Sequence, residues 1–537
     1  MSNQAFQKES EFNWNIPEDY NIVDEVAAYG ESNPDKVAFY WENEDGKKVE
    51  LSYSDLVRDF SRFGSYLESL GIGGEDPVMH ILPRATEVFT IQLGTLMTGA
   101  IAVPCSEMLK PKNIKYRAEN SGAVAIVAHS SNFEVVEEVR DELDLEHYFL
   151  VGADREGWKS FEEALAEGTA GFESSELKAE DPMTINYTSG TTGDPKPVLH
   201  KHRWIAAHKQ TTGRFWWGID REKLSGEELI WATTAPGWAK WYWSPIGVGL
   251  ANGLTQLLYH GSFDPETYLD FIEKYEVTHL CATPTEYRMF SQVENLDKYE
   301  FKLEAALSAG EPLNVEPIEK FQNKFNVTIR DGYGQTESVC LACNRPGMDV
   351  KPGSMGKPTP GPDATVVDEG GEALPSGKIG EIVVKKDNPG IFDGYWKSPE
   401  LDEETFGEAW YRTGDLAQLD EDGYFWFEGR ADDIIISSGY RIGPFEVEDS
   451  LVSHPAVKEA AAVGKPHEER GQIVKGMVVL SSGYSPSKEL VEELQNHVKN
   501  DTAPYKYPRE IEFVQELPKT SSGKIRRKEL REEMDTG

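Results

Sequence analysis

The sequence predicts an α/β protein with a large amino-terminal domain, built from βαβ subdomains and a β-rich subdomain, and a small α+β carboxy-terminal domain. Short apolar runs alternate with helix-length segments over residues 36–152, and this rhythm returns from Val277. A separate α+β pattern follows the Gly/Arg/Asp turn at 429–433. At 537 residues the chain is too long for one ordinary core.

The first βαβ unit is expected over residues 36–152, with a parallel sheet. Lys36–Trp41 is a predicted strand and Glu44–Gly46 a turn. Ser54 is expected to cap a helix with one apolar face, formed by Leu56, Val57, Phe60, Phe63, Leu67 and Leu70. Further strands are predicted at 78–82, 101–104, 124–128 and 148–151. An acidic, small-residue stretch from about Glu156 to Glu180 is expected to separate this unit from the next.

A Ser/Thr/Gly loop, Tyr187–Lys196, follows the apolar run Met183–Asn186. Its glycines let backbone N–H groups turn inward, its hydroxyls add donors, and Lys196 adds a compact positive charge. Two residues separate the second glycine from the lysine, so this is not a Walker A loop. The loop is expected to hold polyphosphate; the alternative is an exposed flexible turn.

Six of the 13 tryptophans lie between Trp216 and Trp243. They form either a core layer or the apolar wall of a pocket for an organic substrate. His200 and His202 form an H-x-H pair nearby, but the sequence places no third ligand. Packing or hydrogen bonding is therefore favoured over metal binding.

Two later segments, Ala305–Pro312 and Val327–Glu337, are predicted strands that end in Gly-rich turns, where open parallel sheets bind ligands. Glycines and prolines from 352 to 371 indicate a turn-rich, all-β passage through Val384. A domain boundary is expected at 431–433, giving domains at 1–430 and 431–537.

The small domain is expected to contain helices from Pro444 and Ser487 and strands near 457–463, 474–480 and 511–514. Its basic, glycine-hinged tail, Pro518–Lys524, is either an anion-binding finger or a solvated basic terminus.

Composition excludes several function classes. The formal charge of -39, from 93 acidic and 54 basic residues, argues against a nucleic-acid partner. It favours a surface adapted to high salt, as in halophilic proteins, over one that attracts a basic partner. Four cysteines fit a reducing compartment, and the Cys340/Cys343 CxxC alone is weak evidence for zinc or redox chemistry. Without a signal segment or an 18-residue apolar run, the chain is expected to be cytoplasmic. No feature assigns an oligomeric state.

Six motifs, in order, make the chain resemble the AMP-forming acyl-CoA synthetases of the adenylate-forming superfamily, which also contains firefly luciferase and peptide-synthetase adenylation domains. They are 187–196, 332–337, 411–415, 429–433, 438–441 and 519–524. Residues 439–447 and 503–509 look most like the medium-chain branch. The resemblance covers nearly the whole chain and implies two half-reactions: a carboxylate and ATP give acyl-AMP and pyrophosphate, and the CoA thiol then displaces AMP.

The resemblance also implies residue roles for ATP and Mg²⁺. The β- and γ-phosphates would be held by Thr188, Ser189, Gly190, Thr191, Thr192, Gly193 and Lys196. Thr336 would contact the α-phosphate, and Glu337 would bind Mg²⁺. The adenine would lie among Gly310, Glu311, Pro312 and Asp331 and stack on Tyr333. Asp415 and Arg430 would hold the ribose, and Arg441 would contact phosphate.

In the same resemblance, Lys524 would bridge the carboxylate and the α-phosphate during adenylation. Asp432 is at the family's hinge position, about which the small domain rotates. That rotation would remove Lys524 and bring Ser438 and Gly439 to the CoA channel.

The acid itself is less well specified. Acetate-activating enzymes have a tryptophan where this sequence has Gly334, so the acyl pocket is expected to be deeper, although Trp238, Trp241 and Trp243 could refill part of it. A short-to-medium-chain or branched aliphatic acid is predicted, with acetate- or aryl-acid ligases as alternatives. An adenylation enzyme loading a carrier protein would want an acid in the pocket wall, and Pro236–Ser244 has none. A phosphoryl-transfer enzyme would leave Asp415 and Lys524 unexplained, and a nonenzymatic ligand sensor is a further alternative.

Overall fold

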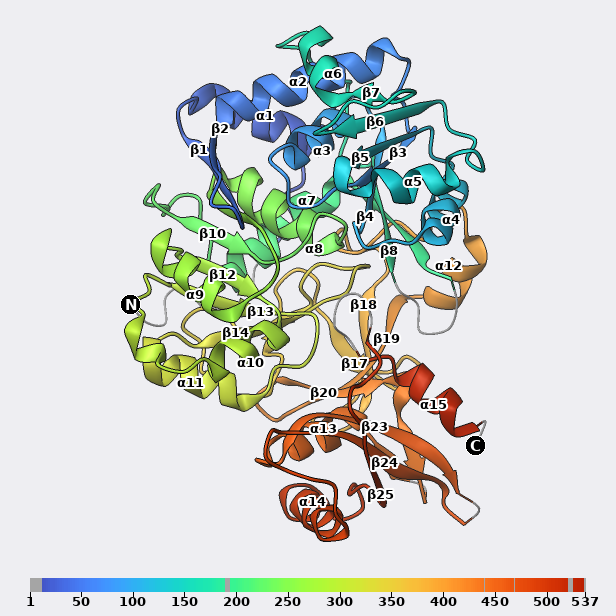
Figure 1. Ribbon diagram of the computed structural model, residues 1–537. Helices are drawn as coiled ribbons and strands as arrows, with labels where there is room; N and C mark the ends of the chain where they lie inside the picture. The colour runs from blue at the N-terminus through green and yellow to red at the C-terminus, as the bar shows by residue number, and fades with distance from the viewer. Residues whose placement is uncertain (1–11, 189–193, 439, 468, 520–524, 536–537) are drawn as a thin grey trace.

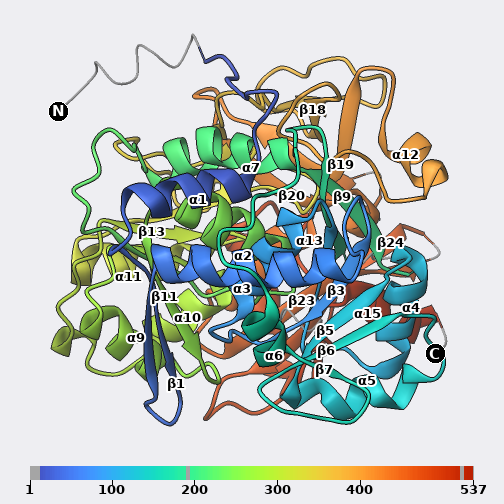
Figure 2. The same ribbon diagram turned by 90° about the horizontal axis from the view of Figure 1, so that it is seen from above.

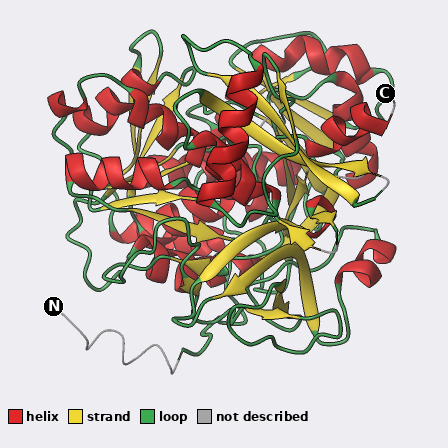
Figure 3. Cartoon of the chain, turned by 90° about the horizontal axis from the view of Figure 1, so that it is seen from below, coloured by secondary structure: helices red, strands yellow, loops and turns green. Residues whose placement is uncertain are grey.

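The computed structural model describes residues 12–188, 194–438, 440–467, 469–519 and 525–535. Three sheets build the large part of the chain and a fourth builds the carboxy-terminal part, which lies below the others in Figure 1. The strands form separate groups with helices around them (Figure 3). No helix of the described residues combines the length and apolar character needed to cross a bilayer.

The first sheet has seven strands in the order β7-β6-β5-β3-β4-β8-β9, mostly parallel, with β9 antiparallel at one edge. Its central strands are buried apolar runs, as parallel strands covered on both faces must be. The strands are β3 (Pro77–Ile81), β4 (Ile101–Cys105), β5 (Ala125–His129), β6 (His147–Val151), β7 (Lys159–Ser160), β8 (Pro182–Thr188) and β9 (Lys196–Lys201). Its helices are α2 (Tyr53–Ser69), α3 (Val88–Met97), α4 (Pro111–Ser121), η2 (Ser130–Asn132), α5 (Phe133–Arg140) and α6 (Phe161–Glu167).

The second sheet has nine strands in the order β16-β15-β14-β13-β12-β10-β11-β1-β2. They are β1 (Val37–Asn43), β2 (Lys48–Ser52), β10 (Leu229–Ala232), β11 (Thr255–His260), β12 (His279–Ala282), β13 (Ala305–Ser308), β14 (Ile329–Tyr333), β15 (Ala342–Cys343) and β16 (Lys357–Pro358). The helices that follow its strands are α9 (Pro265–Lys274), α10 (Pro284–Gln292), η6 (Leu296–Lys298) and α11 (Val315–Phe325). A tryptophan-rich layer contains α7 (His202–His208), η3 (Lys209–Trp217), α8 (Ala239–Trp241), η4 (Tyr242–Gly249) and η5 (Leu250–Asn252).

One hydrophobic core joins these two sheets. It includes α1 (Ile22–Ser32), α2 and α3 together with residues of β1 and β3, and α2 and α3 lie between the two sheets in Figure 2. Side chains of the nine-stranded sheet alternate between faces: Leu280 and Ala306 pack with α9–α11, whereas Cys281 and Leu307 pack with Trp216 and Trp217. The tryptophan-rich layer therefore covers one face of this sheet.

The third sheet is antiparallel and the fourth belongs to the carboxy-terminal part. The third contains β17 (Thr365–Val367), β18 (Gly380–Lys385), β19 (Trp410–Leu419) and β20 (Phe425–Arg430), with α12 (Pro399–Thr405) nearby. After η7 (Ala431–Asp433) come β21 (Ile435–Ser437), β22 (Tyr440–Ile442), α13 (Pro444–Val452), β23 (Val457–His467), β24 (Gly471–Leu480), α14 (Lys488–Asp501), β25 (Glu510–Phe513) and α15 (Arg527–Asp535). The predicted α/β class with a β-rich passage and a final α+β region is confirmed.

Three local predictions were wrong. Ser52, not Ser54, caps α2, because its hydroxyl accepts from the Asp55 N–H at 3.1 Å and the Asp55 carboxylate accepts from the Ser52 N–H at 3.2 Å. β1 leaves the first βαβ unit and pairs with β11 in the nine-stranded sheet. The expected separating stretch, Glu156–Glu180, contains β7 and α6, and β7 extends the seven-stranded sheet by pairing with β6.

Candidate functional site

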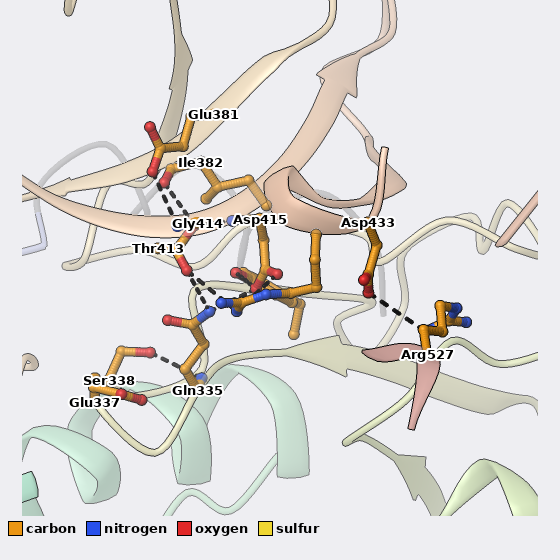
Figure 4. Close-up of polar contacts among 12 residues, drawn as sticks. Gln335, Glu337, Ser338, Glu381, Ile382, Thr413, Gly414, Asp415, Asp433 and Arg527 are labelled. Atoms are coloured by element: carbon orange, nitrogen blue, oxygen red, sulfur yellow. Dashed lines mark hydrogen bonds and ion pairs between the residues drawn. The ribbon is translucent and has the colours of Figure 1, made fainter. Parts of the chain in front are cut away.

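The carboxyl ends of β13 and β14 meet the middle of β19 and the carboxyl end of β20 at one place in the fold. Ser308 pairs with Asp331, so the turn after β13 and the hairpin after β14 lie side by side. Asp415 of β19 pairs with Arg430 of β20. Parallel sheets bind ligands outside the carboxyl ends of their strands, which makes this the candidate site (Figure 4).

Asp415 is the centre of a hydrogen-bonded cluster. Its carboxylate accepts from the Tyr333 hydroxyl at 2.7 Å, from Gln335 Nε2 at 2.6 Å and from the Arg430 guanidinium at 3.1 Å. Gln335 Nε2 also donates to the Thr413 carbonyl at 2.9 Å. The Asp415 residue is only 5% exposed, so these donors replace the water that the carboxylate loses on burial. The cluster ties the β14 hairpin to the third sheet.

The predicted adenine-binding residues lie beside this cluster. Gly310 has φ of +114°, which favours glycine, and a Cβ built on it would meet no atom within 4 Å, so open space adjoins it. Glu311 accepts from the Thr285 N–H at 2.8 Å, and Pro312 is half-buried. Asp331 is buried, accepts from the Gly332 N–H at 3.0 Å, and has its pKa raised by that burial.

Thr336 and Glu337 come directly after Gln335 in the chain. Figure 4 shows Glu337 beside Gln335. The Tyr395 hydroxyl donates to the Glu337 carboxylate at 3.2 Å, and burial raises the pKa of Glu337. Lys196 places its Nζ 5.2 Å from the centre of the Tyr395 ring. The structure thus brings together the lysine of the phosphate loop and the carboxylate predicted to bind Mg²⁺. His200 Nε2 lies 2.7 Å from the Thr336 carbonyl.

The fit of Mg²⁺ depends on these donors. Among the described residues, no group of three His, Cys, Asp or Glu side chains is arranged to hold a metal ion. Mg²⁺ is commonly held by one or two carboxylates together with substrate phosphates. Glu337 supplies one such carboxylate beside the phosphate loop, so the residues fit an ion that arrives with ATP.

The tryptophans divide between core and site. Trp241 is fully buried, stacks on Phe89 with ring centroids 5.1 Å apart and donates to Gln92 at 2.8 Å, so it belongs to the core and does not refill the pocket. Trp243 is partly buried and stacks on His208 at 5.3 Å, and Trp238 is also partly exposed. The pocket-wall interpretation therefore remains for Trp238 and Trp243.

Gly334 lies in the β14–β15 hairpin with its backbone exposed. A Cβ at this position would lie 2.7 Å from the Val339 carbonyl oxygen, closer than real Cβ contacts. A tryptophan here would therefore shift the hairpin backbone.

Several predicted residues lie at the edge of, or outside, the described residues. Thr188 and Lys196 are described and pair across the β8–β9 ladder, whereas Ser189, Gly190, Thr191, Thr192 and Gly193 lie outside the described residues, as do Gly439 and Lys524. The backbone of Arg441 is in β22, but its side chain is not described. Ser438 is exposed with φ of +50°, and Asp432 is exposed in η7.

Two arginines of α15 contact acidic residues of the carboxy-terminal part. Arg527 donates to the Glu448 carboxylate at 3.0 and 2.6 Å and lies 3.8 Å from Asp433. Figure 4 shows Asp433 and Arg527 to one side of the Asp415 cluster. Arg531 also bonds Asp433. These contacts hold η7 and α15 together.

Sequence reasoning gave no role to several residues that shape this site. Gln335 lies inside the 332–337 motif, and that position could have indicated a role in the site. Nothing in the sequence pointed to Tyr395. His200 was assigned to packing or hydrogen bonding, and the structure places it in both. The Cys340 and Cys343 thiols are buried and free; Cys340 Sγ donates to the Ala342 carbonyl at 3.2 Å.

Comparison with known proteins yields consistent matches. A family model described as AMP-binding enzyme matches residues 26–396, and one described as AMP-binding enzyme C-terminal domain matches 446–524. The chain is 45% identical over 518 residues to the uncharacterized acyl-CoA ligase YtcI of Bacillus subtilis, covering 96% of each chain. It is 39% identical over 550 residues to human acyl-coenzyme A synthetase ACSM3, mitochondrial, covering 99% of this chain and 92% of that one.

Solved structures of a CoA ligase and an acyl-CoA synthetase also match the chain. The anthranilate CoA ligase AuaEII in complex with anthranoyl-AMP superposes with a TM-score of 0.89 at 29% identity, covering 98% of this chain and 99% of that one. An acyl-CoA synthetase from Brucella canis has a TM-score of 0.73 at 34% identity, covering 99% and 98%.

Proposed function

Because the chain belongs to the AMP-binding enzyme family and is an AMP-forming acyl-CoA synthetase, we propose that the site between the ends of β13 and β14 and the β19–β20 pair carries out the adenylation step. The Asp415 cluster is the observation that carries this proposal. It fixes Tyr333, whose ring would stack on the adenine, and it presents Asp415 and Arg430 to the ribose.

The phosphates of ATP would lie toward β8 and β9. The loop from Thr188 to Lys196 would hold the β- and γ-phosphates, and Thr336 the α-phosphate. Lys196 is already held beside Tyr395, close to the Glu337 carboxylate. Glu337 would hold Mg²⁺, which would neutralise phosphate charge when bound. Gly310, Glu311, Pro312 and Asp331 would line the adenine, where the space beside Gly310 is open.

Adenylation turns a poor electrophile into a good one. Attack on a free carboxylate builds charge on a group that is already anionic, whereas AMP is a good leaving group. The carboxylate oxygen attacks the α-phosphorus, the bond to pyrophosphate breaks, and the CoA thiol later displaces AMP from the acyl carbon. Positive charge and positioning therefore matter more than a protein nucleophile. Lys524 would supply the charge in the first step and Arg441 would contact phosphate.

The two steps would use the two domains we propose at 1–430 and 431–537. Asp432 would be the hinge, and rotation would replace Lys524 with Ser438 and Gly439 at the CoA channel. Support comes from η7, where β20 ends and the small domain begins, and from the Arg527–Asp433 contact that links the tail to the hinge.

For the acid we propose a short-to-medium-chain or branched aliphatic carboxylate. Gly334 leaves the acyl side without the tryptophan of acetate-activating enzymes, and the human relative is named as an acyl-coenzyme A synthetase. An aryl acid is the second candidate, because aromatic rings of Trp216, Trp243 and His208 lie together on the tryptophan-covered face and a structural neighbour is an anthranilate ligase.

We also propose the cellular and ionic conditions in which the enzyme works. The charge of -39 favours a hydrated surface adapted to high salt in a cytoplasmic, halophilic protein, with small molecules as its partners and no nucleic acid. Folding measured against salt concentration tests the salt adaptation: stability that does not rise with salt would contradict it.

Half-reaction assays test the mechanism. Pyrophosphate release is measured across aliphatic and aryl acids, with and without CoA, and thioester formation is measured from supplied acyl-AMP. Lys524→Ala is expected to slow pyrophosphate release by roughly 10² or more, the scale of losing one oxyanion donor, while leaving thioester formation largely intact. Equal loss in both steps would contradict domain rotation, and ADP as product would contradict adenylation.

A further inference from the structure

We infer that His200 is a positioning residue for adenylation: its side chain fixes the peptide group between Thr336 and Glu337, and so the direction of the Glu337 carboxylate. This rests on the proposed roles of Thr336 and Glu337. His200 lies on β9, the strand that begins at Lys196, and its Nε2 lies 2.7 Å from the Thr336 carbonyl, 136 residues away. Strand β9 therefore carries Lys196 of the phosphate loop and also contacts Thr336, the residue proposed to bind the α-phosphate.

The imidazole is held in one orientation and one protonation state. Its ring stacks on Trp204 with centroids 3.7 Å apart and planes 14° apart, and the residue is fully buried. Burial lowers the pKa of His200 to about 3, so the ring is neutral near pH 7. A carbonyl can only accept, so the proton must be on Nε2 and absent from Nδ1.

The unpaired ring nitrogen of His200 also supports a role for its hydrogen bond. His200 Nδ1 is buried and has no hydrogen-bond partner among the described residues. An apolar side chain at this position would pack against Trp204 without leaving such an atom unsatisfied. The imidazole therefore contributes its Nε2–H bond, in addition to its packing.

The peptide plane transmits the effect to Glu337. A trans peptide places its carbonyl oxygen and its N–H on opposite sides, so fixing the Thr336 carbonyl fixes the Glu337 N–H. The Glu337 carboxylate in turn accepts from the Tyr395 hydroxyl at 3.2 Å. The peptide that His200 orients therefore leads directly into the residue whose carboxylate is proposed to bind Mg²⁺.

Other contacts keep the fold of this segment independent of His200. The Phe392 N–H donates to the Glu337 carbonyl at 2.8 Å, and the Asp393 N–H donates to the Leu199 carbonyl at 2.9 Å. Residues 392–393 thereby bridge Glu337 and β9 through backbone bonds alone. Loss of the imidazole should release the Thr336 carbonyl without separating these segments.

His200→Leu removes the donor, and His200→Gln keeps an N–H that can reach the same carbonyl. His202→Leu and His202→Gln are matched controls, because His202 is equally buried beside β9 but has no side-chain hydrogen bond to the Thr336–Glu337 segment. Each full-length variant is assayed for pyrophosphate release, for thioester formation from supplied acyl-AMP, and by calorimetry for its dissociation constants for ATP with Mg²⁺ and for ATP in EDTA.

His200→Leu is expected to slow pyrophosphate release about tenfold, the range expected for one buried hydrogen bond, and to weaken binding of ATP with Mg²⁺. Its thioester formation and its ATP affinity in EDTA should stay within about twofold of the parent. His200→Gln should recover most of the loss. Equal effects of the leucine variants at 200 and 202, or an unchanged affinity for ATP with Mg²⁺, would overturn the inference.

Glu337→Gln separates this failure from failure of the proposed function. If Glu337→Gln weakens binding of ATP with Mg²⁺ and His200→Leu does not, the positioning role of His200 is wrong and the site assignment stands. If Glu337→Gln has no effect on either half-reaction, the assignment of Glu337 is wrong, and the inference drawn from it falls with it.

Discussion

Replacing Asp415 by alanine should both destabilise the large domain and abolish nucleotide binding. Asp415 is 5% exposed. Its carboxylate accepts hydrogen bonds from Tyr333, Gln335 and Arg430 at 2.7, 2.6 and 3.1 Å. Hydrogen bonds to charged groups contribute about 1.5–3 kcal/mol each, but their sum would overcount a shared acceptor. The Arg430 side chain is 39% exposed and water can solvate it once the carboxylate is gone, so we expect a loss near the top of the range for one such bond, about 3 kcal/mol.

Unfolding in urea, followed by tryptophan fluorescence, measures the loss. A double-mutant cycle with Tyr333→Phe isolates one bond: burial raises the pKa of Tyr333 well above its usual value, so its hydroxyl remains a donor. Tyr333→Phe should destabilise the parent by about 1.5 kcal/mol and should have almost no effect in the Asp415→Ala background. An equal cost in both backgrounds would refute the Tyr333–Asp415 bond as a stabilising contact.

Three further variants test other parts of the structure. Ser52→Ala should lower the unfolding free energy by about 0.5–2 kcal/mol through loss of the α2 cap, whereas Ser54→Ala should have little effect; equal costs in urea unfolding would contradict the capping assignment. A bulky side chain at Gly439 should impair thioester formation more than pyrophosphate release, and the reverse result would remove Gly439 from the CoA channel. In Gly443→Val, the added Cβ would lie 2.0 Å from the Glu428 carbonyl, so one half-reaction should slow more than the other; two unchanged rates would show that this contact does not control domain orientation.

Local patterns in the sequence predicted most of the fold. The buried strands β3–β6 were found because continuous apolar runs bounded by turns have few other interpretations. The pattern could not show that β1 crosses to the second sheet, since its pairing with β11 joins residues more than two hundred positions apart. The choice between Ser52 and Ser54 failed because both precede the same apolar face, and only the Asp55 contact distinguishes them.

In the candidate site, too, some residues could be predicted from the sequence and others could not. Motif residues such as Asp415 and Tyr333 were predicted through a family resemblance, and the structure joins them by a hydrogen bond across 82 positions. Tyr395 and His200 were not assigned to the site, because each contacts it through a hydrogen bond fixed by tertiary packing. Such contacts have no local period or spacing that a sequence would reveal.

The distribution of positive charge gives a reason why the small domain would supply the cation that completes the adenylation site. On an acidic protein, ATP and a carboxylate must both approach against a repulsive field. The cations of the large domain at this site are already engaged: Arg430 pairs with Asp415, and Lys196 rests over the Tyr395 ring. In the small domain, Arg527 and Arg531 are bound to Glu448 and Asp433 and so cannot also serve the reacting groups.

The proposed role of Lys524 follows from this arrangement. A cation placed permanently beside the acyl and α-phosphate groups would favour the adenylate and would hold AMP after the thiol attacks. A cation carried by a rotating domain can stabilise the first transition state and then leave, which lowers that barrier without slowing the release of AMP. The bonds from Arg527 and Arg531 to Asp433 attach α15 to η7, the segment about which we propose that the small domain rotates.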